Sequence, residues 1–222
     1  MVYGLTIFVS AFLLFQVQFI IGKHLLPWFG GAPAVWSACQ VFFQSMLLVG
    51  YAYAHALTRK AGTRRQAQIH ISLLVVASAW LGLSALADGV PLLPGAQFKP
   101  SVDGDPTREL LAALAVSVAL PFLVLSANAP LVQSWHARSG LPLDRTYRLY
   151  ALSNVGSLLG LVSYPFGIEV LLGLNEQAWL WTVLFLVFAI GCGTVAWRAA
   201  RHVPAAALPV AVDPAAAAGE AT

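Results

Sequence analysis

The chain has 222 residues, of which 59% are hydrophobic and only 9% are charged, and its formal net charge is +3. An ordinary soluble domain is roughly 45–50% apolar and about 25% charged, so this composition excludes a soluble globular enzyme. It also excludes a disordered chain, which combines low hydrophobicity with high net charge. Because a membrane-spanning helix takes about 20 residues, the length admits at most about six or seven spans.

Six long apolar stretches predict six transmembrane helices. They are Tyr3–Gly22, Ala34–Leu57, Ala67–Leu86, Leu110–Trp135, Leu149–Leu172 and Gln177–Trp197. A transmembrane β-barrel would instead show segments of about 10 residues that alternate apolar and polar positions. We therefore expect an all-α, polytopic membrane bundle over residues 1–201, followed by a flexible Ala/Pro-rich tail over residues 202–222.

Proline and capping residues mark the predicted helix ends and bends. Pro33 suits the first turn of the second helix. Asp105 or Thr107 is expected to cap the fourth helix, because both side chains accept hydrogen bonds from the free N–H groups of a first turn. Prolines inside a helix remove a backbone hydrogen bond and predict a kink or a break. These prolines are Pro121, Pro130 and Pro165.

Basic residues predict the orientation of the bundle. When the connections are assigned alternately to the two sides, nine basic residues fall on one side: Arg59, Lys60, Arg64, Arg65, Arg138, Arg145, Arg148, Arg198 and Arg201. Only Lys23, Lys99 and Arg108 fall on the other. Cytoplasmic loops carry an excess of Lys and Arg, so we expect a multi-pass inner-membrane protein with both termini in the cytoplasm. We also expect the first helix to be retained, since its apolar run is longer than that of a signal peptide.

The sequence contains no motif for binding phosphate, dinucleotide or zinc, and no nucleophile elbow. We therefore expect no cofactor, no metal and no nucleic-acid partner. His55 and His70 flank the first cytoplasmic loop; they are interpreted as residues at helix ends, and a bis-histidine site is the alternative. Cys39 and Cys192 lie in apolar runs and are interpreted as small buried residues.

Amides are the main polar groups inside the predicted spans, which carry no charged residue well within them. Gln40 and Gln44 lie one helical turn apart on the second span, and Gln16, Asn128 and Asn154 lie on the first, fourth and fifth. Either these amides line a polar cavity or they form interhelical hydrogen bonds, which contribute about 0.6–2 kcal/mol each. Hydrogen bonding between helices is the preferred interpretation.

Small residues form a stripe on the fifth span. Ser153, Gly156, Ser157 and Gly160 recur at spacings of three and four residues and include a G-x-x-x-G pattern. Such a stripe lets another helix approach to backbone contact, so we expect these residues to pack tightly against a helix. The partner helix belongs either to this chain or to another protein.

Four runs of residues resemble the N-terminal membrane region of the bacterial fused MFS/spermidine synthase family. They are LFQVQ at 14–18, LPWFGGAPAVW at 26–36, GYAYAH at 50–55 and YRLYALSNVGS at 147–157. The resemblance extends from Tyr3 to Trp197 and implies a bundle similar to half of a major facilitator in a bacterial inner membrane. Asn128 departs from the family, whose members more often carry a small hydroxyl residue there.

The family typically continues into further helices and an aminopropyltransferase-like domain. Here only a short tail follows Arg201, so the resemblance carries over no synthase site and we expect no enzyme activity. The leading hypothesis is an accessory or scaffold subunit that packs in the lipid bilayer against partner membrane proteins or copies of itself. The alternative is a half-transporter that binds or moves a small polar, polyamine-like solute as a dimer. A third interpretation is an electron-transfer subunit that uses His55 and His70.

Overall fold

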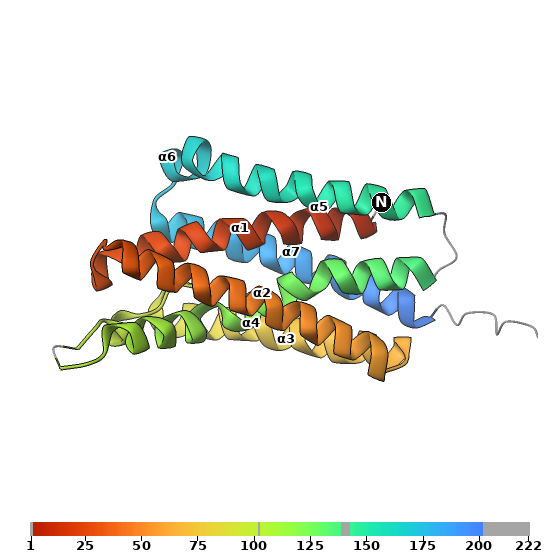
Figure 1. Ribbon diagram of the computed structural model, residues 1–222, viewed down its shortest axis with the longest axis horizontal. Coiled ribbons are helices and arrows are strands. Elements are labelled where there is room, and N and C mark those ends of the chain that lie inside the picture. Colours follow the sequence, from red (N-terminus) through yellow and green to blue (C-terminus); the bar gives the residue numbers. More distant parts are fainter. Residues whose placement is uncertain (1, 102, 139–142, 202–222) are drawn as a thin grey trace, which may run out of the picture.

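A computed structural model of the chain contains six long helices that lie side by side (Figure 1). The structure describes residues 2–101, 103–138 and 143–201, so the predicted tail lies outside the described residues. The helices are α1 (Val2–Phe29), α2 (Pro33–Lys60), α3 (Thr63–Asp88), the 3-10 turn η1 (Ala96–Phe98), α4 (Pro106–Arg138), α5 (Leu143–Ser163), the π-helical turn η2 (Tyr164–Ile168), α6 (Glu169–Leu171) and α7 (Leu174–Arg201).

Six helical segments of the described chain are long and apolar enough to cross a membrane, the fifth of them running over Tyr147–Leu171. Their outward faces carry large exposed apolar side chains, such as Leu48 on α2, Val75 on α3 and Ile190 on α7. In water such faces would be costly, whereas a bilayer solvates them. The predicted fold class is confirmed: the chain is an all-α, multi-pass membrane protein whose helices contact lipid.

Local sequence signals account for several helix boundaries. Gly30 has a φ of 79° directly after α1 ends, a conformation that favours glycine, and Pro33 is the first residue of α2. The Asp105 carboxylate accepts hydrogen bonds from the backbone N–H of Thr107 (2.9 Å) and of Arg108 (3.4 Å). Of the two predicted caps of α4, Asp105 is therefore confirmed and Thr107 is wrong.

The three prolines predicted to kink or break a helix lie in different local structures. Pro121 and Pro130 both lie within α4, which continues as one helix through them. Pro165 instead lies in η2, where the α-helical hydrogen bonding of α5 has ended at Ser163. Because proline cannot donate a backbone hydrogen bond, a wider π-helical turn is a place where its missing N–H is tolerated.

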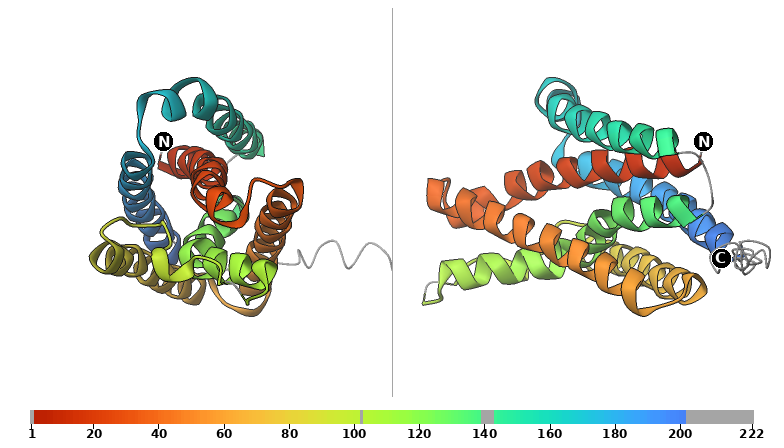
Figure 2. Two further views of the ribbon diagram at one scale, coloured as in Figure 1. Left: turned by 90° about the vertical axis from the view of Figure 1, so that its left-hand side faces the viewer. Right: turned by 45° about the vertical axis from the view of Figure 1, so that its right-hand side comes forward.

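α1 and α4 form the centre of the bundle. They are its most buried spanning helices, whereas α2 and α5 are its least buried ones. α1 packs against α5, α4 and α7, and α4 packs against α2, α1 and α3, while α3 and α7 pack against each other. Figures 1 and 2 show α1 (red) between α5 (teal) and α4 (green).

Glycines permit the closest helix contacts. A Cβ atom at Gly156 would lie 2.5 Å from the carbonyl oxygen of Phe8, and one at Gly160 would lie 2.7 Å from that of Phe12. These distances are shorter than van der Waals contact, so only glycine allows α5 to lie this close to α1. Gly50 has the same role in α2, because a Cβ atom there would overlap the Ser126 side chain on α4.

The two ends of the bundle differ in charge. The connection between α2 and α3 lies at a basic end, where the described charged side chains are all cationic: Arg59, Lys60, Arg64, Arg65, Arg138, Arg148, Arg198 and Arg201. Two of these bond carbonyls in the last turns of neighbouring helices, Arg64 at Ala200 (3.4 Å) and Arg138 at Thr58 (3.3 Å). The connection between α3 and α4 lies at the opposite, acidic end.

Candidate functional site

A cleft of about 480 Å³ opens between α2 and α5, with α1 and α4 behind it. Each of these four helices contributes side chains to its wall. The lining residues are Ser10, Ala11, Leu14, Phe15, Gln18, Phe19, Trp36, Gln40, Phe43, Gln44, Leu47, Tyr51, Phe122, Leu125, Ser126, Ala129, Ser153, Ser157 and Leu161. The cleft is therefore a mixed surface of aromatic rings, amides and hydroxyls.

Five amide and hydroxyl side chains of the cleft make no hydrogen bond within the described part of the chain. They are Gln40, Gln44, Tyr51, Ser153 and Ser157. The remaining amides and hydroxyls bond the backbone of their own helix: Gln18 at Leu14, Ser10 at Ile7 and Ser126 at Leu123. Free donors and acceptors thus gather on the α2 and α5 walls of the cleft.

Gln16 and Asn128 are amides of a different kind, because both are buried and join helices. The Gln16 Nε2 donates to the carbonyl oxygen of Gly160 (2.6 Å) and to the Ser163 hydroxyl (3.0 Å). The Asn128 Nδ2 donates to Ser10 Oγ (2.8 Å) and to a carbonyl on α1, while its Oδ1 accepts from Cys192 Sγ (3.2 Å). Gln16 thus links α1 with α5, and Asn128 links α4 with α1 and α7.

The predicted packing stripe on α5 is divided between two surroundings. Gly156 and Gly160 face α1 of the same chain, whereas Ser153 and Ser157 line the cleft. The five predicted amides are divided as well. Gln40 and Gln44 line the cleft and Gln16 and Asn128 bond other helices, while Asn154 is exposed on α5 and is not a lining residue.

The structure does not bring His55 and His70 together. His70 is buried, with its Nδ1 3.4 Å from the Tyr53 hydroxyl and its ring beside Trp135, whereas the His55 side chain is exposed. The described residues contain no group of three or more His, Cys, Asp or Glu side chains placed to hold a metal ion. Cys39 and Cys192 are both buried free thiols, as predicted.

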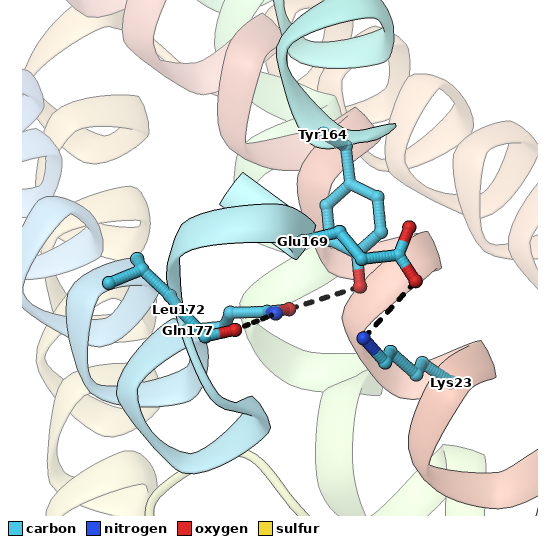
Figure 3. Close-up of polar contacts among 5 residues, drawn as sticks. All are labelled: Lys23, Tyr164, Glu169, Leu172 and Gln177. Carbon is cyan, nitrogen blue, oxygen red and sulfur yellow. Dashed lines mark hydrogen bonds and ion pairs between the residues drawn. The ribbon is translucent and has the colours of Figure 1, made fainter. Parts of the chain in front are cut away.

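A cluster of polar contacts lies where α5 reaches the acidic end of the bundle (Figure 3). We call this cluster the α5–α7 junction. The Tyr164 hydroxyl donates to Gln177 Oε1 (3.0 Å), and the Gln177 Nε2 donates to the Leu172 carbonyl (2.8 Å). Lys23 Nζ lies 3.1 Å from a Glu169 carboxylate oxygen. These contacts hold η2 and α6 against α1 and α7, and the Tyr164 ring stacks on Phe19 at one end of the cleft.

Sequence reasoning missed several lining residues, of which Tyr51 was detectable. It lies 11 residues after Gln40, so Gln40, Gln44, Leu47 and Tyr51 follow one face of a helix at spacings of four, seven and eleven residues. Extending the pair of glutamines along that face would have found it. The serines of α1 and α4 carried no such signal, since they lie on faces whose other lining residues are mostly apolar.

These features define a class: a multi-pass membrane bundle with a partly polar cleft between two of its least buried helices. No protein-family model, curated protein or solved structure matches the chain. The cleft is therefore the feature from which a function is inferred.

Proposed function

We propose that the chain is one half of a membrane transport assembly and that its cleft binds a small polar solute. The observation that carries this proposal is the set of five cleft amides and hydroxyls that make no hydrogen bond with any described residue. Polar groups in a membrane protein interior normally find partners, as the Asn128 amide and the Gln16 Nε2 group do. The cleft volume of about 480 Å³ falls within the roughly 300–1,000 Å³ typical of small-molecule sites.

The order of the helices supports the same proposal. The chain crosses the bundle three times between the start of α1 and the start of α4, so these two helices run in opposite directions (Figure 1). The units α1–α3 and α4–α7 are therefore oppositely oriented, with α1, α2 and α3 matching α4, α5 and α7. Their main contacts match in the same way: α1–α5 corresponds to α4–α2, and α1–α7 corresponds to α4–α3. Oppositely oriented repeats with a central site between them are typical of secondary transporters.

The exposed polar residues of α2 and α5 favour a partner bundle over this face. Gln44, Tyr51 and Asn154 are exposed, although they belong to spanning helices. Amides in contact with hydrocarbon are costly unless they are hydrogen-bonded. We propose that a second copy of the chain covers them and closes the cleft, so that the transporting unit is a dimer.

An accessory or scaffold role is the second candidate, and the exposed Asn154 outside the cleft favours it. The glycines of the α5 stripe no longer support it, because they contact α1 of the same chain. Neither role requires catalysis. Membership of the fused MFS/spermidine synthase family and a bacterial inner-membrane location are likewise proposals, supported by the residue runs quoted above and by the charge difference between the two ends.

The proposed topology, with the basic end in the cytoplasm, predicts which connection is reachable from outside the cell. Gly62 lies between α2 and α3, and Gln97 is an exposed residue between α3 and α4. In intact cells an impermeant thiol reagent should label Gln97→Cys and leave Gly62→Cys unlabelled. The native cysteines are buried and should contribute little background. The reverse labelling pattern would invert the topology.

Thermal melting of purified protein in mild detergent tests solute binding. A panel of small polar solutes, comprising nucleosides, polyols, amino-acid amides and polyamines, is titrated against the parent, a Gln40→Leu/Gln44→Leu double variant and a matched control, Gln68→Leu, at an exposed glutamine of α3 that does not line the cleft. At least one solute should raise the melting temperature saturably for the parent and the control but not for the double variant. If no solute distinguishes the double variant from the control, the proposed function is wrong.

A further inference from the structure

The chemistry of the cleft wall selects among the solutes that the proposed function admits. We infer that its ligand is an uncharged molecule with a flat apolar body and a hydrogen-bonding edge such as an amide, and that it is not a polyamine. This inference rests on the proposed function, since it names the class of solute for the same site. Three properties of the wall carry it: its lack of charge, its aromatic rings and its free amides and hydroxyls.

The helical segments that form the wall contain no carboxylate, ammonium, guanidinium or imidazole side chain. Residues 10–19 of α1, 36–51 of α2, 122–129 of α4 and 153–161 of α5 include no Asp, Glu, Lys, Arg or His. A cation that enters the cleft therefore loses hydration without gaining a carboxylate partner. Burying an unpaired charge is strongly unfavourable, and a polyamine carries several. An anion meets the same obstacle.

The charge that follows the α1 wall segment is already engaged in an ion pair. Lys23 follows the α1 wall segment by one helical turn, and its Nζ is 3.1 Å from Glu169 at the α5–α7 junction (Figure 3). A cationic solute would have to displace Lys23 to use that carboxylate, and an anionic one would have to displace Glu169. The ion pair thus offers the cleft neither a free negative nor a free positive group.

Aromatic side chains form a large part of the wall. Six of its residues are aromatic: Phe15, Phe19, Trp36, Phe43, Tyr51 and Phe122. Aromatic rings bury large apolar areas and prefer stacked or edge-to-face contact with other flat groups. A flat apolar body therefore fits this wall better than a sugar or a polyol, which exposes hydroxyl groups on every side.

The free amides and hydroxyls of the wall can each both donate and accept hydrogen bonds. The amides of Gln40 and Gln44 and the hydroxyls of Tyr51, Ser153 and Ser157 share this property. A neutral amide on the ligand would satisfy donors and acceptors at once. A protonated amine would leave the acceptors occupied and the amide N–H groups without a partner.

Three probes of nearly identical shape separate charge from fit: benzamide is neutral, benzamidinium is cationic and benzoate is anionic. Spermidine serves as the polyamine. Each is titrated against the parent, Gln40→Leu/Gln44→Leu and Gln68→Leu, an exposed amide on α3 outside the cleft, with saturation-transfer NMR in detergent as the readout and the melting temperature as the check on folding. We expect benzamide to bind the parent and Gln68→Leu at least tenfold more tightly than benzamidinium, benzoate or spermidine, and to lose this binding in the double variant.

Every other outcome is decisive. Binding of benzamidinium, benzoate or spermidine that depends on the two glutamines and equals or exceeds that of benzamide leaves the proposed function standing and overturns the neutral class. The absence of glutamine-dependent binding by any probe overturns the neutral aromatic class, while the wider solute panel decides the proposed function separately.

A gain of function sharpens the test, because Gln40→Glu places one carboxylate on the wall without altering the length of the side chain. The preference should then shift from benzamide toward benzamidinium. Since the variant must fold to bind either probe, a parallel measurement of benzamide on the same sample reports misfolding. Unchanged preference in a folded Gln40→Glu protein overturns the inference that wall charge sets the ligand class.

Discussion

α5 has two contrasting sides, a sealed seam with α1 and an open cleft toward α2. At the seam Gly156 and Gly160 bring its backbone against Phe8 and Phe12 of α1. The Gln16 Nε2 there donates a hydrogen bond to the Gly160 carbonyl. At the cleft Ser153 and Ser157 leave their hydroxyls without a bond in the described chain. One helix thus contributes both to the stability of the bundle and to its candidate site.

This division follows from helix geometry. Successive residues of an α-helix are rotated by about 100°, so Gly156 and Ser157 face different neighbours although they belong to one sequence stripe. The contrast teaches that small residues at helical spacing need not share a function. It also gives a rule that mutations can test: substitutions at the seam should affect folding, whereas substitutions at the cleft should affect binding.

The largest expected effect is at the seam, with Gly160→Leu. Its Cβ atom would lie 2.7 Å from the Phe12 carbonyl oxygen, which belongs to the backbone and cannot move aside cheaply. Overpacking of this kind typically costs about 1–3 kcal/mol, and we expect the upper end, roughly 3 kcal/mol. Denaturant unfolding in mixed micelles, followed by circular dichroism, measures the loss.

Two controls accompany that variant. A Cβ atom at Gly193 meets no atom within 4 Å, so Gly193→Leu should change the free energy of unfolding by less than about 0.5 kcal/mol. Leu161→Met, at a half-exposed position of the cleft wall, should be similarly small. Equal losses in Gly160→Leu and Gly193→Leu would show that the seam is not a tight contact.

An intermediate effect is expected from the buried amide of α4. Asn128→Leu removes the bonds to Ser10, to α1 and from Cys192, and it leaves those groups buried. We expect a loss of about 1–2 kcal/mol in the free energy of unfolding, near the upper end for interhelical hydrogen bonds in membranes. Gln68→Leu, at an exposed amide of α3, should be neutral or slightly stabilising in the same assay. If the two variants lose equal stability, the distinction between joining and exposed amides is wrong.

The smallest effect is expected at the α5–α7 junction. The Lys23 Nζ and a Glu169 carboxylate oxygen are 3.1 Å apart. The two side chains are 41% and 42% exposed, so the ion pair is well solvated. Exposed pairs contribute less than about 1 kcal/mol, and Lys23→Met should cost no more than that. The loss should shrink further in high salt, which screens the pair. A salt-independent loss of several kcal/mol would mean that Lys23 acts through packing.

Local features of this fold were predictable from the sequence, because each depends on a few adjacent residues. Six apolar runs gave six spanning helices, and Asp105 before Pro106 gave the cap of α4. Gln40 and Gln44 could be placed on one face of one helix. Each of these sequence signals can be interpreted without knowledge of any other part of the chain.

The assignment of each amide to a bond or to the cleft was not predictable. The preferred interpretation, hydrogen bonding between helices, describes Gln16 and Asn128 but not Gln40 and Gln44. A glutamine on α1 and one on α2 look alike in sequence, and only the packing of α1 against α5 supplies a carbonyl to the first. The cleft itself combines residues up to about 150 positions apart along the chain, so no local pattern encodes it.

The π-helical turn η2 also fixes the register of everything that follows it. A π-turn closes over five residues where an α-helix closes over four, so it absorbs one surplus residue between the cleft wall and α6. Without that residue the chain beyond η2 would be rotated by about 100°, and Glu169 would no longer point toward Lys23. The single extra residue thus acts as a spacer that sets the angle between α5 and the end of the bundle, independently of the residues that line the cleft.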